Sequence, residues 1–184
     1  MPQDALPDVP PPGGLAPRWR FLLTAGVLYL LWVLVYQGHV LPDGRLDSWL
    51  CVNLAAAGAG LLRVLGFAGT AQPGGPLVLM DGLPAVIVGS ACDGMALYAL
   101  FAGFVLALPG RWQPKLWFIP LGIVAIYLLN IVRVAALALN HHYAHRSVDF
   151  NHHYTFTFVV YACIGLLWMW WARHYGPAEP AATA

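Results

Sequence analysis

Four apolar stretches divide the chain, and each predicts a helix that crosses a membrane. They run from about residue 21 to 36, from 92 or 95 to 108, from 116 to 139 and from 155 to 171. An α-helix of about 20 residues spans the hydrocarbon core of a bilayer, which is about 30 Å thick. The pattern therefore indicates a bundle of about four transmembrane helices.

Basic residues at the ends of these stretches predict how the chain is oriented. Arg18 and Arg20 precede the first stretch and no small-x-small cleavage site follows it, so we expect a retained helix with a cytoplasmic amino terminus. Arg111 and Lys115 lie in the short loop after the second stretch, which we also place in the cytoplasm. The last stretch ends in an aromatic and basic margin typical of the water interface: Trp168, Trp170, Trp171 and Arg173.

Residues 48–68 predict an amphipathic helix on the outer face of the membrane, with Asp47 or Ser48 as its cap. Its small-residue stretch 55–60, AAAGAG, allows another helix to approach closely. If this segment crossed the membrane instead, the chain would have five crossings rather than four. Its leucines recur at helical spacing, at Leu50, Leu54, Leu61 and Leu65.

The segment between this helix and Cys92 predicts a short β-hairpin on the same outer side. Two β-prone runs within residues 76–90 flank the dipeptide Asp81-Gly82, which favours a type I′ turn, although Pro84 weakens the second strand. We expect this extracytoplasmic hairpin to lead directly into Cys92.

Composition supports an all-α integral membrane protein that also has the amphipathic outer helix and the short β-hairpin. Of 184 residues, 60% are apolar and 9% are charged, and the net charge of +1 offers no basic stripe for nucleic acid. The proline-rich residues 1–17 predict a disordered cytoplasmic tail, residues 18–175 the membrane domain, and residues 176–184 a second disordered tail.

Three polar side chains on different predicted helices are predicted to lie at the same depth in the membrane. Cys92, Arg133 and His153 lie 19, 18 and 20 residues from the basic residue at the opposite end of their helix. At the rise of an α-helix these separations are about 28, 27 and 30 Å. We therefore expect all three to meet at the outer boundary.

A thiol, a guanidinium and an imidazole at one site predict nucleophilic catalysis. A neighbouring cation or imidazole can stabilise the thiolate of Cys92. An arginine in an apolar helix costs so much free energy that it is usually retained for a function. Arg133 can stabilise an oxyanion or grip a substrate carboxylate or carbonyl, and His153 can act as base and then acid. A substrate helix would dock laterally between the helices that carry Cys92 and Arg133.

Three further residues support this site. Asn130 lies one turn before Arg133 and can hold either its guanidinium or the substrate. Asp93 either orients His153 or caps the helix that follows. His152 is the alternative base. The other two cysteines, Cys51 and Cys163, are read as ordinary buried residues, and the odd count without a CxxC pair predicts no disulfide framework and no thiolate zinc site.

The motifs GSACDGM, LLNIVRVA and NHHYTF, in this order and spacing, resemble those of the exosortase and archaeosortase family of membrane transpeptidases. The resemblance covers residues 45 to about 173 and is to the compact bacterial forms. It departs from the family at Asp93, where many members have serine, and at Thr157, where glycine is frequent.

The resemblance implies a cysteine transpeptidase of the cytoplasmic (inner) membrane with its site on the extracytoplasmic side. Such an enzyme needs no cofactor and no metal. Its partners are membrane-anchored proteins with a carboxyl-terminal sorting signal of the PEP-CTERM kind, which it cleaves through a cysteine thioester. Cys92 would be the nucleophile, Arg133 the oxyanion or substrate partner and His153 the base.

Two other classes of function remain open from the sequence. The clusters HHYAH and HHY are similar to the histidine boxes of metal-dependent membrane enzymes, although those need about eight ligands on the cytoplasmic side. A non-catalytic membrane assembly subunit would need only the aromatic helices and the small-residue stretch.

Overall fold

The computed structural model describes residues 17–108, 110–143 and 156–175. The predicted bases His152 and His153, residues 1–16 of the predicted tail 1–17, and the predicted tail 176–184 lie outside these ranges.

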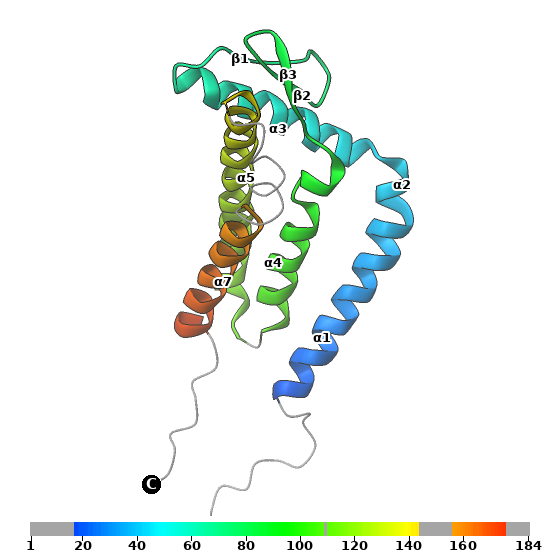
Figure 1. The fold of residues 1–184 in the computed structure, drawn as a ribbon. Coiled ribbons are helices and arrows are strands. Elements are labelled where there is room, and N and C mark those ends of the chain that lie inside the picture. Colours follow the sequence, from blue (N-terminus) through cyan, green and yellow to red (C-terminus); the bar gives the residue numbers. More distant parts are fainter. Residues whose placement is uncertain (1–16, 109, 144–155, 176–184) are drawn as a thin grey trace, which may run out of the picture.

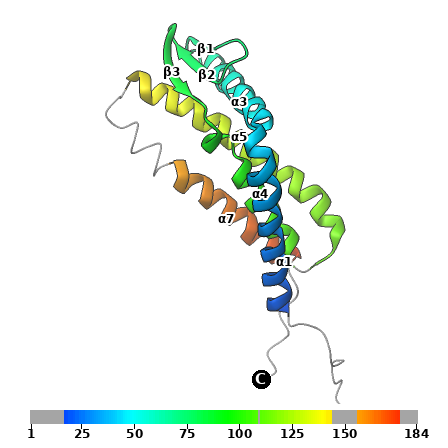
Figure 2. The same cartoon turned by 90° about the vertical axis from the view of Figure 1, so that its right-hand side faces the viewer.

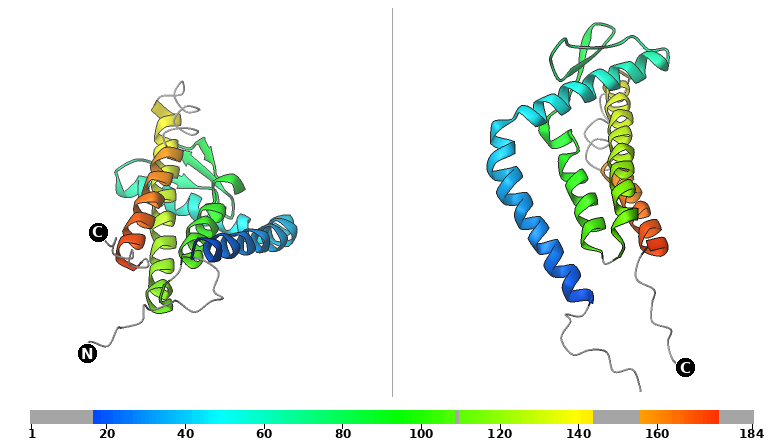
Figure 3. Two further views of the ribbon diagram at one scale, coloured as in Figure 1. Left: turned by 90° about the horizontal axis from the view of Figure 1, so that it is seen from below. Right: turned by 180° about the vertical axis from the view of Figure 1, so that it is seen from behind.

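Long helices run side by side and one helix crosses over their common end (Figure 1). The first long helix consists of α1, a π-helical stretch and the short α2, and the helices of the bundle are completed by α4, α5 and α7. Their bounds are α1 Pro17–Leu31, the π-helical stretch Trp32–Val40, α2 Leu41–Asp43, α4 Met95–Ala107, α5 Trp112–Tyr143 and α7 Phe156–Tyr175. Helix α3 (Arg45–Val64) lies across α1, α4 and α5 in views from opposite sides (Figures 1 and 3). The described structure is therefore mostly helical, as predicted.

Two of these helices are long and apolar enough to cross a membrane, Arg18–Asp43 and Trp112–Tyr143. No residue in the most apolar window of the first is buried within the protein, so a wide apolar surface faces outward. Helix α4 is apolar but only 13 residues long. Two helices thus meet the requirement among the described residues, which is fewer than the four crossings predicted.

Helix α3 begins earlier than predicted and without a side-chain cap. The chain turns at Gly44, whose φ of 67° favours glycine, and α3 starts at Arg45. Asp47 and Ser48 therefore lie within the first turns, so their predicted role as the cap is wrong. Of the predicted apolar stripe, Leu50 and Leu54 are buried and Leu61 is half-buried against the core, whereas Leu65 lies just beyond the helix end and is exposed. The buried face consists of Asp47, Leu50, Cys51, Leu54, Ala55, Gly58, Ala59 and Leu62.

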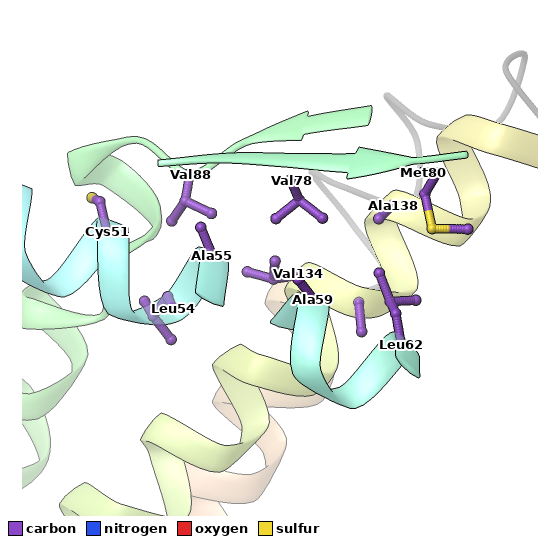
Figure 4. Packing of buried hydrophobic residues seen from close by; sticks show 11 residues of the cluster. Cys51, Leu54, Ala55, Ala59, Leu62, Val78, Met80, Val88, Val134 and Ala138 are labelled. Carbon is purple, nitrogen blue, oxygen red and sulfur yellow. The ribbon is translucent and has the colours of Figure 1, made fainter. Parts of the chain in front are cut away.

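The small-residue stretch allows the close approach that was predicted for it. A Cβ at Gly58 would lie 2.6 Å from Cγ1 of Val134 on α5, closer than atoms of two side chains can come. A side chain at position 58 would therefore push α3 away from α5. Figure 4 shows Ala55 and Ala59 on this face of α3, with Val134 and Ala138 of α5 beside them.

The predicted hairpin is present and a third strand extends it. Strands β2 (Leu77–Met80) and β3 (Leu83–Ile87) pair antiparallel around Asp81 and Gly82, whose φ values of 51° and 79° suit a type I′ turn. Pro84 sits beside a bulge in β3, an edge strand, where its missing N–H does least harm. Strand β1 (Gly69–Ala71) pairs with β2 and was not predicted, because three residues carry no readable alternation.

The sheet packs on α3 and on the carboxyl-terminal part of α5 (Figure 2). Val78 and Met80 of β2 are buried, as is Val88 just after β3. These side chains point toward α3 in Figure 4 and share a core with it. This core fixes the segment that leads from β3 to Cys92.

Part of the aromatic end of α7 belongs to a second core. Trp171 is 1% exposed and stacks on Phe118 of α5 at a centroid distance of 4.6 Å. Trp168 stacks on Phe104 of α4 at 4.1 Å. Of the predicted margin, Trp170 and Arg173 remain exposed. The rings are buried because α7 packs against both α4 and α5.

Candidate functional site

Cys92 lies in a tight turn just before α4, which begins at Met95, the later of the two predicted starts. Ser90–Cys92 form one turn of 3₁₀ helix, in which the Cys92 N–H donates to the Gly89 carbonyl at 2.8 Å. The Asp93 carboxylate then accepts from the Met95 N–H at 2.8 Å, at the start of α4. Of the two roles predicted for Asp93, the structure shows the capping one.

Arg133 of α5 reaches the sulfur of Cys92. Its Nη2 donates to Sγ at 3.4 Å, across a separation of 41 residues in the chain. The predicted convergence of these two side chains is therefore confirmed. A guanidinium that donates to sulfur stabilises the negative charge of a thiolate, which is the nucleophilic form of cysteine.

Gly94 brings the Cys92 turn close to α5. Its φ of 90° lies where side chains are strained, and a Cβ would clash with Nδ2 of Asn130 and lie 2.9 Å from the Tyr98 hydroxyl. Asn130 is fully buried and packs directly under this turn. A larger residue at position 94 would therefore displace Cys92 from Arg133.

We predict that Gly94→Ala destabilises the fold by about 3 kcal/mol, the sum of backbone strain and overpacking. Gly89→Ala is the matched control, because Gly89 has an extended backbone with φ of −97° and open space around its Cα. Thermal unfolding of both variants in detergent measures the difference. Equal unfolding temperatures would show that the close contact with Asn130 does not constrain the turn.

Asn130 itself makes no hydrogen bond of standard geometry within the described part of the chain, although both its polar atoms are buried. The structure thus shows no hydrogen bond from Asn130 to Arg133, one of the two roles predicted for it. The other role, a contact with substrate, stays a prediction.

Asp47 and Tyr36 also belong to this site and were missed in the sequence. The Tyr36 hydroxyl donates to Oδ1 of Asp47 at 2.5 Å, and Asp47 lies within hydrogen-bonding reach of Asp93. A signal did exist, because Asp47 precedes Leu50 and Leu54 at helical spacing and so shares their apolar face. A carboxyl group on the buried face of an amphipathic helix suggests that it has a polar partner in the interior of the protein.

Buried polar atoms without a hydrogen-bond partner concentrate around the Cys92 turn. Among the described residues they include Oδ2 of Asp47, Oδ2 of Asp93, the Tyr98 hydroxyl and both polar atoms of Asn130. Folded proteins leave few such atoms, and each one calls for an explanation such as a ligand, water or proton. Their concentration at one place supports a functional site there.

The three cysteines differ in their surroundings. Burial, followed by the nearby Asp93 and Asp47, raises the pKa of Cys51 to about 11, so it stays a neutral thiol. Cys163 lies on α7, half-buried. Cys92, also half-buried, has the Arg133 guanidinium against its sulfur. Its surroundings are the ones that suit a nucleophile.

A wide apolar groove runs along the bundle between α1 and α4. It encloses about 770 Å³ and is lined by residues such as Phe21, Trp32 and Tyr36 on the first helix and Leu100 on α4. Helices α4 and α5, by contrast, are in direct contact, because Phe101 fills the space that a side chain at Gly122 would need. The predicted docking of a substrate helix between α4 and α5 is therefore wrong. The open groove lies on the other side of α4.

A smaller cavity of about 250 Å³ lies between the start of α3 and the segment before α4. Asp47, Cys51 and Ser90 are among its lining residues. Ser90 belongs to the turn that carries Cys92, so the cavity lies beside this turn.

The histidines are only partly described. At the end of α5, His142 pairs with Asp81 of the hairpin turn at 3.2 Å and so ties the sheet to this helix. Across the ranges 17–108, 110–143 and 156–175, no three His, Cys, Asp or Glu side chains are placed to hold a metal ion. The second histidine cluster, with His152 and His153, lies outside these ranges.

Comparisons of the chain with protein-family models, with curated proteins and with solved structures gave no match.

Proposed function

We propose that this protein is a membrane cysteine transpeptidase of the exosortase kind, with Cys92 as its nucleophile. The observation that supports this most directly is the contact of 3.4 Å between the Arg133 guanidinium and the Cys92 sulfur. A cation in an otherwise apolar bundle costs free energy. Stabilisation of a catalytic thiolate would explain why this chain carries a cation against the thiol. The buried polar atoms around the turn add a site where a peptide can be held.

The proposed reaction starts with the docking of a substrate's own membrane helix. The apolar groove between α1 and α4 suits such a helix, because its lining is apolar and it reaches Tyr36, whose hydroxyl contacts Asp47 next to the Cys92 turn. The cleavage motif would then emerge at the end of the bundle that α3 crosses. We place this end on the extracytoplasmic side of the inner membrane, because Arg18, Arg20 and Arg173 lie on helix ends away from α3 (Figure 1).

The proposed reaction then proceeds in two steps. The Cys92 thiolate adds to the scissile carbonyl, and Arg133 stabilises the oxyanion. The C–N bond breaks, the leaving amine takes a proton from His153, and a thioester to Cys92 remains. An acceptor amine or hydroxyl, reaching the site through the cavity beside Asp47, attacks the thioester as His153 takes its proton. The C–S bond then breaks and the Cys92 thiolate is restored.

Trapping the thioester tests this proposal. Membranes that contain the protein and a substrate with a proline-containing motif, an apolar helix and a basic end are quenched in acid. Peptide mass analysis should then find the substrate fragment on Cys92, and hydroxylamine should release it. A metal chelator should leave the adduct unchanged. Processing that is abolished by the chelator, with no adduct on Cys92, would favour the histidine-box enzyme instead. Absence of both processing and adduct would favour an assembly subunit.

A further inference from the structure

Two buried carboxyl groups meet beside the Cys92 turn although they come from different elements. Asp47 of α3 is 4% exposed and Asp93, before α4, is 1% exposed, and the two lie within hydrogen-bonding reach. Oδ1 of Asp47 accepts from Tyr36, and Oδ1 of Asp93 accepts from the Met95 N–H. Each group therefore has a donor on one oxygen.

The second oxygen of each carboxyl group is buried without a hydrogen-bond partner in the described structure. Two ionised carboxylates in this position would repel each other and leave both oxygens unsatisfied. A single proton between them turns one group into a donor and the other into its acceptor, which removes both costs. Burial and the contact with Asp47 raise the pKa of Asp93 to about 7, in agreement with a retained proton.

No cation neutralises the pair within the described ranges. The ion pairs found there are Arg45 with Asp43 and His142 with Asp81, and neither involves Asp47 or Asp93. In the described part of the chain, the titratable groups around the pair are Tyr36 from the first helix, Cys51 from α3, Tyr98 from α4 and Cys92 in the turn itself. Arg133 of α5 donates to Cys92. A proton is thus the simplest charge that can balance the pair.

We propose that Asp47 and Asp93 share one proton and that this pair, joined to Tyr36, acts as a set of positioning residues that hold the Cys92 turn against α3. Loss of the proton in alkaline solution would drive the two carboxylates apart and move Cys92 away from Arg133. The positioning role rests on the proposed transpeptidase, whereas the shared proton does not.

The pH dependence of unfolding tests the shared proton without any substrate. Because the folded protein binds this proton more tightly than the unfolded chain does, the stabilisation is fully present below about pH 4 and is lost as the pH rises through about 7. We expect the unfolding temperature in detergent to fall by about 5 °C between roughly pH 5 and pH 8. In Asp93→Asn the amide donates to Asp47 at every pH, so the unfolding temperature of this variant should not show the fall that the shared proton causes.

Asp43→Asn is the matched control, because Asp43 is an exposed carboxyl near the same end of α3. It should keep the full fall in unfolding temperature. Infrared spectra at neutral pH should show the carbonyl band of a protonated carboxylic acid in the wild-type protein and in Asp43→Asn, and a loss of that band in Asp93→Asn. Equal pH profiles for all three proteins, or no such band, would overturn the shared proton.

Processing assays test the positioning role separately. Wild-type processing should decline at least about threefold above pH 7, Asp93→Asn should process without that decline, and Asp93→Ala should be inactive at every pH. If Asp93→Ala processes like the wild-type protein, the pair does not position Cys92. If no variant and no wild-type protein processes substrate while the infrared band is present, the transpeptidase proposal fails and the shared proton stands.

Discussion

The Cys92→Ala variant is expected to lose processing of a substrate with a carboxyl-terminal sorting signal by about 10⁴-fold or more. In the proposed reaction the sulfur is the atom that forms the thioester, and no other described thiol has a cation against it. Processing in membranes that contain equal amounts of each variant, followed as the loss of the substrate's carboxyl-terminal segment, measures the effect.

Cys51→Ala and Cys163→Ala are the matched controls, and both should retain processing. Cys51 is buried in the core with a raised pKa, and Cys163 lies on α7. Cys51→Ala removes one buried sulfur and is expected to cost about 1 kcal/mol of stability without loss of activity. Full processing by Cys92→Ala would end the proposal that the protein acts through a thioester.

The Arg133→Ala variant is expected to lower the rate of processing by about 10²- to 10³-fold, the usual effect of removing one group that stabilises an oxyanion. It should also slow the alkylation of Cys92 by a small thiol reagent, because the guanidinium no longer donates to the sulfur. Arg133→Lys should recover part of both rates, because an ammonium keeps the charge but not the planar set of donors.

Arg63→Ala serves as the control for charge removal, since Arg63 is exposed near the end of α3. It should change neither rate. The alkylation assay uses a chain in which Cys51 and Cys163 are replaced by alanine, so that only Cys92 reacts. If Arg133→Ala slows processing but leaves alkylation unchanged, Arg133 acts on the substrate alone and not on the sulfur.

Some features of this protein follow from patterns that are local in the chain. The apolar stretches predicted the long helices, and the dipeptide Asp81-Gly82 predicted the hairpin turn, because the preference for positive φ belongs to these residues themselves. Counting residues from the basic helix ends also predicted that Cys92 and Arg133 meet, because the rise of an α-helix is constant. Depth along a bundle is therefore readable from one sequence.

The predictions that failed were those that depend on the rotation of a helix or on its partner. The buried stripe of α3 includes Asp47 and excludes Leu65, and Trp171 of α7 is buried between helices where a margin facing water was expected. Residue type alone does not distinguish a tryptophan at an interface from one in a core. Which neighbour covers the ring decides between them.

The sequence by itself determined that this chain forms long apolar helices and that a thiol and a guanidinium lie at one depth. Only the tertiary structure decided that α3 crosses the end of the bundle, that Gly94 lies against Asn130, and that Asp47 meets Asp93 beside the thiol. Helical rise and turn propensity act between near neighbours in the chain. The crossing angle and rotation of packed helices, in contrast, depend on side chains that fit together across the whole core.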